Sequence, residues 1–343
     1  MNPTEVRNLE RWLDAAGLPG KGEKLELRSI SGGASNELLE LRRGDAVMAL
    51  RQPPRPVPEG RNQTMLREYR VLRALADSDV PHSRVLGVCE DPSVIGACFY
   101  LMDLVDGWSP MNTQGWPAPF DLDLAARHGL GIQLVDGIAR LARVDWKARG
   151  LEGFGKPDNF HERQVDRWLH HLSTFEIREI PGLDLAADWL RRHKPRVYTP
   201  GILHGDYQFA NVMFRHGAPA RLAAIIDWEM STVGDPLIDL GWVVMGWPDP
   251  GEDRAGSGYV DYTGMPSRAE ILAHYASVSG RPVDEIDYYV ILARFKMAAV
   301  LEGGYARHVK GIQKSDKLAA FGPIVLEMAR KAAELARTTP LGQ

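Results

Sequence analysis

The chain changes its hydrophobic periodicity near residue 105, and this change restricts the folds open to it. Before that point, five segments alternate or run apolar between Gly-rich, Gly-Asp and Pro-rich turns: "KLELRSI", "NELLELRR", "AVMALR", "RVLGVCED" and "GACFYLMDLV". Such segments predict the strands of an antiparallel sheet. Residues 60–76 carry apolar side chains at helical spacing, and we expect a further helix at residues 4–16. Residues 1–105 are therefore predicted to form a small α+β lobe.

Residues 106–343 have a different pattern. The Gly-, Pro- and Trp-rich segment "DGWSPMNTQGWPAPF" leads into an amphipathic helix at residues 121–145, and residues 160–193 and 267–336 also have helical character. Only "GILHGD", "NVMFR" and "LAAIID" resemble strands. We predict a larger, mainly helical C-terminal lobe around a short hairpin, so the whole chain is an α+β protein with two lobes.

Composition and charge limit the cellular environment and the binding partners that we expect for this chain. The 343 residues are 44% hydrophobic and 25% charged, which is typical of globular proteins and sufficient for two lobes with a cleft between them. A net charge of −4 without a basic stripe argues against a nucleic-acid partner. Two cysteines, a charged N-terminal segment and no apolar run of about 18–20 residues lead us to expect a cytoplasmic protein without a membrane span. The oligomeric state stays open.

The segment "ILHGDYQFANVMF" interrupts an apolar run with polar groups whose burial without partners is costly. Asp206 and Asn211 stand five residues apart in it, and Asp227 ends the next strand-like segment, "LAAIID". A carboxylate base, an amide oxygen five residues later and a second carboxylate are the arrangement that phosphoryl transfer uses. Asp206 is the candidate catalytic base, and Asn211 and Asp227 are candidate ligands of Mg²⁺, which prefers oxygen.

The N-terminal lobe supplies a candidate cation for phosphate groups. Glu68 shares a helical stripe with Met65 and Leu72, so its carboxylate is expected to point into the apolar interior and to need a cationic partner. Arg51, at the end of the third strand, is the natural candidate. Ala49 lies on the same face of that strand and would leave a flat floor for a purine ring.

A Gly-rich turn precedes both residues. The segment "SISGGASNELLEL" places four small or polar residues between two strands, where backbone N–H groups approach phosphates closely: Gly32, Gly33, Ser35 and Asn36. Taken alone, this turn fits a plain hairpin equally well, so it gains weight only beside the other residues.

In their order along the chain, these residues and the segments "FYLMDLVDG", "HGDYQFAN" and "IIDWEMSTVGDPLIDLGW" resemble the aminoglycoside phosphotransferase-like family. The resemblance covers residues 24–246 and is greatest to the branch related to the kinase-like domain joined to some acyl-CoA dehydrogenases. It implies a protein-kinase-like fold, ATP and Mg²⁺ as cofactors, and the roles given above for Asp206, Asn211 and Asp227. It also implies an adenine-binding hinge formed by Met102, Asp103, Leu104 and Val105. In the wider kinase pattern a Lys is usual where this chain has Arg51, whereas the branch named above shares the Arg; the planar guanidinium differs from a compact ammonium.

The predicted function is transfer of the ATP γ-phosphoryl group to a hydroxyl of a small molecule. The branch favours a hydroxyacyl-CoA or a similar metabolite as acceptor, and a true aminoglycoside kinase and a non-catalytic nucleotide-binding module are the alternatives. A metal-dependent hydrolase built on His204 and Asp206 would need further metal ligands at suitable spacing, and the sequence has no such second cluster.

Several polar and aromatic residues allow two interpretations. His204 either takes part in the chemistry or only fixes its loop through a backbone carbonyl, and Asp235 and Asp239 fit a helix cap and a brace for the catalytic loop. Seven acidic residues form either a surface for a polycation or an ordinary solvated face: Asp249, Glu252, Asp253, Asp261, Asp284, Glu285 and Asp287. Four tryptophans form either a wall for a ligand or ordinary packing: Trp108, Trp116, Trp242 and Trp247.

Overall fold

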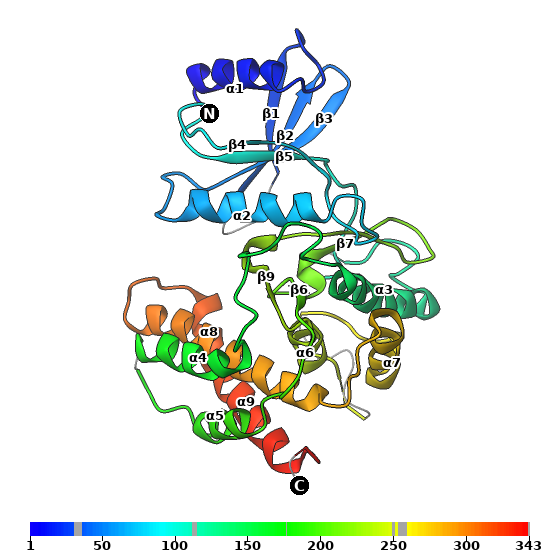
Figure 1. The fold of residues 1–343 in the computed structure, drawn as a ribbon, viewed down its shortest axis with the longest axis vertical. Coiled ribbons are helices and arrows are strands. Elements are labelled where there is room, and N and C mark those ends of the chain that lie inside the picture. Colours follow the sequence, from blue (N-terminus) through cyan, green and yellow to red (C-terminus); the bar gives the residue numbers. More distant parts are fainter. Residues whose placement is uncertain (31–35, 112–114, 176, 249–250, 253–258, 342–343) are drawn as a thin grey trace.

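The structure is a computed structural model that describes residues 1–30, 36–111, 115–175, 177–248, 251–252 and 259–341. It is an α+β fold in which a sheet-bearing N-terminal part stands on a larger, mainly helical C-terminal part (Figure 1). This arrangement confirms the predicted fold class.

The N-terminal sheet has five antiparallel strands in the order β1-β2-β3-β5-β4. Each of the five segments predicted from alternation forms one of them: β1 (Leu25–Ile30), β2 (Glu37–Arg43), β3 (Ala46–Gln52), β4 (Val85–Cys89) and β5 (Phe99–Met102). The alternation of side chains along β3 sends Met48 and Leu50 to one face of the sheet and Ala49 and Arg51 to the other.

A helix covers each face of this sheet (Figure 1). Helix α1 (Pro3–Ala15) buries Leu9 and Leu13 in one apolar cluster with Met48 and Leu50. Helix α2 (Arg61–Ala74) packs on the opposite face, against β4 and β5. The face that carries Arg51 is therefore the face that meets α2.

The C-terminal part contains seven α-helices within the described residues, and α8 packs along both α6 and α9. The helical stretches predicted at 160–193 and 267–336 are divided into separate helices by turns. In chain order the helices are α3 (Leu124–Arg143), α4 (Gln164–Ser173), α5 (Leu183–Arg192), α6 (Leu237–Met245), α7 (Arg268–Ser279), α8 (Ile286–Val309) and α9 (Asp316–Thr338).

Two short antiparallel strand pairs lie beneath the N-terminal part. The predicted hairpin forms between β7 (Val212–Phe214) and β8 (Leu222–Ile225). The expectation of a single hairpin is wrong, because β6 (Gly201–Leu203) pairs with β9 (Thr232–Gly234), a strand that the sequence did not predict. Loops 204–211 and 226–231 both connect one strand pair to the other, which brings the loops together.

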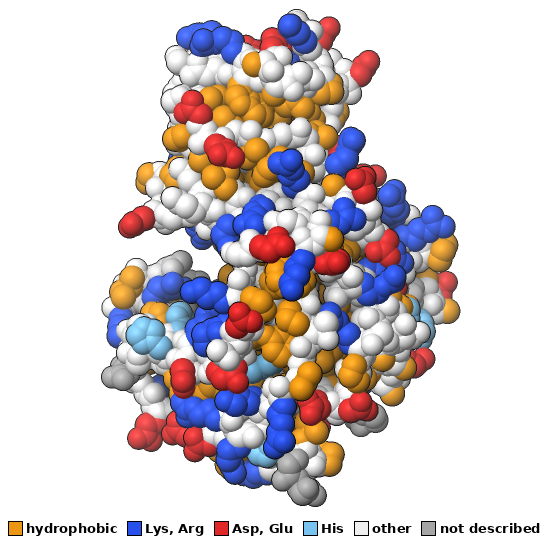
Figure 2. All heavy atoms as spheres, viewed as in Figure 1, with side chains coloured by type: hydrophobic (Ala, Val, Ile, Leu, Met, Phe, Trp, Pro, Cys, Tyr) orange, Lys and Arg blue, Asp and Glu red, His pale blue; other side chains and the backbone are white. Residues whose placement is uncertain are grey.

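Arginines of α2 fasten the two parts to each other. Arg70 donates hydrogen bonds to the backbone oxygens of Gly150 and Glu152, at 2.9 and 2.8 Å. Arg61 pairs with Glu229 of loop 226–231 at 2.9 Å. Figure 2 shows that the molecule is hollowed between the sheet-bearing part and the C-terminal helices, with Lys and Arg side chains beside the hollow. Within the described ranges, no helix has the length and apolar character that crossing a membrane requires.

Candidate active site

Helix α6 holds the start of loop 204–211. The buried carboxylate of Asp239 accepts hydrogen bonds from the backbone N–H groups of His204 and Gly205, the latter at 2.8 Å. Burial raises the pKa of Asp239 to about 6, while the two N–H donors oppose that rise. The predicted role of Asp239 as a brace for this loop is confirmed.

The ring of His204 connects loop 204–211 to loop 226–231. Its Nε2 donates to the backbone oxygen of Ile226 at 2.9 Å, and its Nδ1 accepts the N–H of Asp206 at 3.3 Å. Burial lowers the pKa of His204 to about 4, so the ring is neutral near pH 7 and its two nitrogens suit these opposite roles. The contacts match the structural interpretation of His204.

The carboxylate of Asp206 is half-buried and is held on both oxygens. Oδ1 accepts a hydrogen bond from Gln208 Nε2 and Oδ2 accepts one from Asn211 Nδ2, each at 2.9 Å. Burial raises the pKa of Asp206, although Lys296 and these two donors oppose the rise. A carboxylate that is oriented and made more basic in this way suits a general base.

The backbone brings Asn211 and Asp227 together. The N–H of Ile226 donates to the backbone oxygen of Asn211 at 2.9 Å, which places Asp227 beside the end of loop 204–211. Asp227 adopts the left-handed backbone conformation with φ of 63°, which is uncommon for a residue other than glycine and recurs at functional sites.

An ion-pair network reaches this site from the N-terminal part. Arg51 Nε donates to Glu68 Oε2 at 2.7 Å, and Arg51 Nη2 donates to Asp227 Oδ1 at 2.9 Å. Glu68 is fully buried and also accepts hydrogen bonds from Tyr100 Oη at 3.0 Å and Asn36 Nδ2 at 3.2 Å. Burial raises the pKa of Glu68, and Arg51 opposes that rise. The predicted pair of Arg51 and Glu68 is therefore present.

The remaining candidates for nucleotide binding lie around this network or outside the described residues. Ala49 is the register partner of Met102, so the proposed purine floor lies beside the start of the hinge. Asp103, Leu104 and Val105 follow β5 without regular secondary structure. Asn36 contacts Glu68, whereas three residues of the turn fall outside the described ranges: Gly32, Gly33 and Ser35.

Sequence reasoning missed Lys296 of α8. Its Nζ donates to the backbone oxygen of Gly205 at 2.6 Å and lies 4.4 Å from the ring centre of Trp242. Burial lowers the pKa of Lys296 to about 8, while Asp206 and Asp239 favour the charged form. The signal in the sequence was a single lysine among apolar residues in "ILARFKMAAV", in a helix that otherwise fills the core.

The seven acidic residues that were considered for a polycation surface differ in their surroundings. Asp261 pairs with Arg127 at 2.7 Å, Asp287 with Arg268 at 3.2 Å and Glu252 with Lys331 at 3.9 Å. Asp284 and Glu285 are exposed, and Asp249 and Asp253 are outside the described ranges. Trp108, Trp116 and Trp247 pack against other aromatic rings. The fourth tryptophan, Trp242, lies against Lys296.

Known proteins match this chain over most of its length. A family model described as the phosphotransferase enzyme family matches residues 26–277. Acyl-CoA dehydrogenase family member 10 of Mus musculus is 30% identical over 317 residues, which cover 91% of this chain and 29% of that protein. Acyl-CoA dehydrogenase family member 11 of Gallus gallus is 30% identical over 342 residues, covering 96% and 43%. The chain thus spans less than half the length of these relatives.

Solved structures show the same fold. A candidate aminoglycoside phosphotransferase from Ralstonia eutropha has 31% identity and a TM-score of 0.83, with 97% of this chain and 98% of that chain covered. An aminoglycoside phosphotransferase in a ternary complex with AMP-PNP and hygromycin B has a TM-score of 0.60 at 15% identity, with coverages of 97% and 99%. The predicted kinase-like fold is confirmed.

Proposed function

Because this chain belongs to the phosphotransferase enzyme family, we propose that it uses ATP and Mg²⁺ to phosphorylate a hydroxyl group of a small molecule. The observation that carries the proposal is a continuous set of contacts across the cleft. Glu68 holds Arg51, Arg51 holds Asp227, and Asp227 follows the residue that is bonded to Asn211. Phosphoryl transfer needs positioned charge more than covalent chemistry, and this set supplies it.

Asp206 is proposed to orient the acceptor hydroxyl and to accept its proton. Its carboxylate is fixed by Asn211 and Gln208, and burial favours its protonated form relative to a free aspartate. Both effects help a group that must take a proton during transfer and release it afterwards.

The side chains at this site suit Mg²⁺, which prefers oxygen ligands. Asn211 donates through Nδ2 to Asp206, which leaves its Oδ1 as an acceptor, and Asp227 contacts Arg51 through Oδ1 alone among the described residues. Asn211 and Asp227 are therefore the residues proposed to hold the metal, which would offset negative charge on the phosphates. Arg51, which donates to Asp227 Oδ1 at 2.9 Å, places a protein cation beside the same position.

The acceptor proposed is a hydroxyacyl-CoA or a similar metabolite. Curated relatives named as acyl-CoA dehydrogenase family members support this choice, although the present chain covers less than half of each. An aminoglycoside acceptor is the alternative, since solved relatives of the same fold include enzymes crystallised with hygromycin B. The other alternative is a nucleotide-binding module without catalysis.

The test is Mg²⁺-dependent release of ADP by the purified chain with hydroxyacyl-CoAs, sugars, choline and aminoglycosides as acceptors. Asp206→Asn should lower turnover by about 10²–10⁴-fold while AMP-PNP still binds, because only the base is removed. Asp227→Asn should remove the Mg²⁺ dependence of AMP-PNP binding. Asp184→Asn, an equal change at an exposed position on α5, is the control and should behave as the unmodified chain.

Two results would contradict the proposal. Normal turnover in Asp206→Asn would show that Asp206 is not the base. Tight binding of Mg²⁺ and AMP-PNP without transfer to any acceptor would favour the non-catalytic module.

A further inference from the structure

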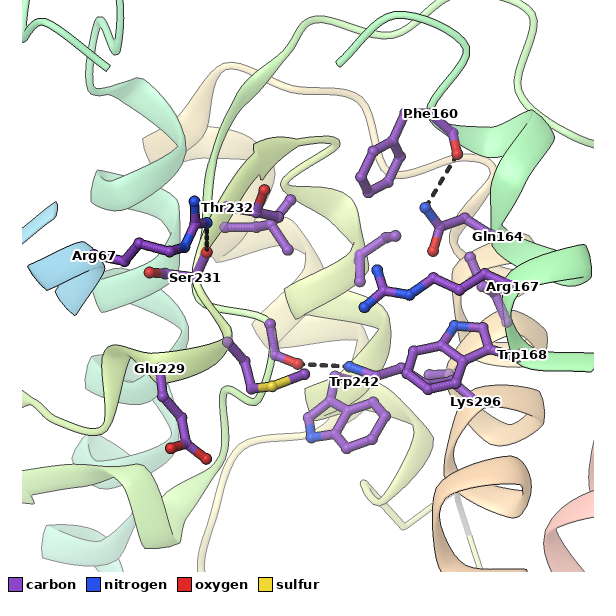
Figure 3. Close-up of a pocket in the computed structure, with 16 residues that line it drawn as sticks. Arg67, Phe160, Gln164, Arg167, Trp168, Glu229, Ser231, Thr232, Trp242 and Lys296 are labelled. Carbon is purple, nitrogen blue, oxygen red and sulfur yellow. Dashed lines mark hydrogen bonds between the residues drawn. The ribbon is translucent and has the colours of Figure 1, made fainter. Parts of the chain in front are cut away.

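A pocket of about 310 Å³ opens beside the catalytic loop, and the proposed function does not yet use it. Its walls come from α4, α6 and α8, from loop 226–231 and from Arg67 of α2 (Figure 3). Gly205 lines it, and the next residue along the chain is Asp206. The pocket therefore reaches the residue that precedes the candidate base.

The charges that line this pocket are mainly positive. Its lining includes three cationic side chains, those of Arg67, Arg167 and Lys296, and a single carboxylate, that of Glu229. Glu229 is already paired with Arg61 at 2.9 Å. The pocket thus presents an excess of positive charge to whatever enters it.

Arg67 is occupied by the protein itself. It donates hydrogen bonds to the backbone oxygens of Phe154 and Ser231 at 3.0 and 3.3 Å, and its guanidinium lies 4.3 Å from the centre of the Phe154 ring. Its role is to hold α2 against the C-terminal part. The cations that remain for a ligand are those of Arg167 and Lys296.

Arg167 and Lys296 approach the pocket from α4 and α8 and point into the same space (Figure 3). Arg167 rests over Trp168, with 5.1 Å from the guanidinium carbon to the ring centre, and pairs with no carboxylate of the described residues. Lys296 uses one of its three N–H donors for the hydrogen bond to the backbone oxygen of Gly205. The guanidinium of Arg167 and the remaining N–H donors of Lys296 are therefore available to a ligand.

A further donor lies in the same wall. The indole N–H of Trp168 is buried and has no hydrogen-bond partner among the described residues. A buried donor without a partner is unfavourable, so such groups often mark a place where a ligand or water supplies the missing acceptor. Arg167, Lys296 and Trp168 share one chemistry, because all three donate hydrogen bonds and two are cations.

We propose that Arg167 and Lys296 form an anion-binding subsite, which recognises a carboxylate or phosphate group of the phosphoryl acceptor. The proposal rests on the proposed function and specifies its substrate class. Charge-assisted hydrogen bonds to such groups are stronger than neutral ones, and arginine in particular binds them in a bidentate manner. A polycation such as an aminoglycoside would instead place its ammonium groups against two protein cations, which disfavours it.

The test measures binding of matched probes by titration calorimetry, with the nucleotide site filled by AMP-PNP and Mg²⁺. Glycerate, glycerol 3-phosphate and glycerol share one carbon skeleton and differ in charge, and kanamycin represents the polycations. We expect glycerate or glycerol 3-phosphate to bind, with the stronger of the two identifying the anionic group. Glycerol and kanamycin should bind at least about tenfold more weakly, since one charge-assisted hydrogen bond is worth that factor or more.

Variants assign the binding to the pocket. Arg167→Gln should weaken binding of the preferred anion by about tenfold or more, and Arg167→Lys should restore part of it. Arg192→Gln is the matched control, because Arg192 is exposed on α5, donates to the backbone oxygen of Asp188 in its own helix and does not line the pocket. It should bind the anion as the unmodified chain does.

The inference is overturned if neither anion binds at millimolar concentration, if kanamycin or glycerol binds as tightly as the anions, or if Arg167→Gln leaves anion binding unchanged. The proposed function has a separate readout in AMP-PNP binding and ADP release. Rapid ADP release with kanamycin would thus overturn the anion subsite and leave the phosphotransferase intact. A failure to bind AMP-PNP would contradict the phosphotransferase instead.

Discussion

Replacing Arg51 with methionine should destabilise the protein by several kcal/mol, because it strands a carboxylate in the interior. Arg51 Nε lies 2.7 Å from Glu68 Oε2, which separates the centres of the two charges by about 4 Å. With an effective dielectric constant of about 20, their attraction is about 4 kcal/mol. Glu68 keeps its hydrogen bonds from Tyr100 and Asn36, but these are neutral donors.

Protonation of Glu68 sets an upper limit to this cost. Neutralising a glutamate with an ordinary pKa of about 4.3 at pH 7 takes about 3.7 kcal/mol, and a stranded carboxylate escapes by that route. We therefore expect Arg51→Met to lower the free energy of unfolding by about 3–4 kcal/mol at pH 7. Loss of the cation raises the pKa of Glu68 further in the folded variant, so its stability should fall, relative to the unmodified chain, as the pH rises from 5 to 7.

Urea denaturation of the nucleotide-free protein, followed by circular dichroism, measures this cost in a double-mutant cycle. Arg51→Met/Glu68→Met should be less destabilised than the sum of its single variants by about 2 kcal/mol or more, because paired apolar side chains replace a buried ion pair well. Additive single variants, or a cost below about 1 kcal/mol for Arg51→Met, would refute the assignment of a coupled, buried pair.

Two further predictions concern the helices behind the site. A Cβ at Gly241 of α6 would lie 2.6 Å from the backbone oxygen of Tyr289 in α8, so Gly241→Ala should lower the free energy of unfolding by about 1–3 kcal/mol. Gly246→Ala is the control, because a Cβ there would meet no described atom nearer than 3.7 Å, and it should change the free energy of unfolding little. Equal effects of the two substitutions would contradict the close contact between α6 and α8. Burial lowers the pKa of Lys296 from 10.5 to about 8. Between pH 8 and pH 10.5 the unfolded chain therefore binds a proton at Lys296 that the folded chain lacks, so the free energy of unfolding should rise by about 2–3 kcal/mol across this range. Lys296→Met should lack this rise in urea titrations from pH 8 to 10, and parallel curves for the two proteins would exclude a buried ammonium.

The sequence predicted the helices and strands whose hydrophobic periodicity extends over enough residues to be recognised. Alternation identified all five strands of the N-terminal sheet. The stripe that Glu68 shares with Met65 and Leu72 indicated a buried carboxylate, and strand alternation indicated Arg51 as its partner. The sequence also led us to expect that Asp239 braces loop 204–211, and two backbone hydrogen bonds confirm it. These inferences started from the position of each residue within its own helix or strand.

Features that depend on distant segments could not be predicted in this way. Strand β9 has three residues, as β6 and β7 do, but it lacks the apolar run that indicated those two strands, and it pairs with β6. Lys296 is far along the chain from Gly205, and only the packing of α8 against α6 brings them into contact. No spacing rule connects such residues, so the pocket proposed for the acceptor could be recognised only in the structure.

The two loops and the proposed acceptor subsite are held by different kinds of contact. Loops 204–211 and 226–231 are held at both ends by the same two strand pairs and across the middle by His204, so their geometry depends on backbone pairing. The proposed acceptor subsite depends instead on side chains of α4 and α8, above all Arg167, which forms no bond to either loop among the described residues. Lys296 is the exception, because it both lines the pocket and holds Gly205. Substitution at Arg167 should therefore alter which acceptor is bound with little effect on the catalytic loop, whereas substitution at Lys296 should affect both.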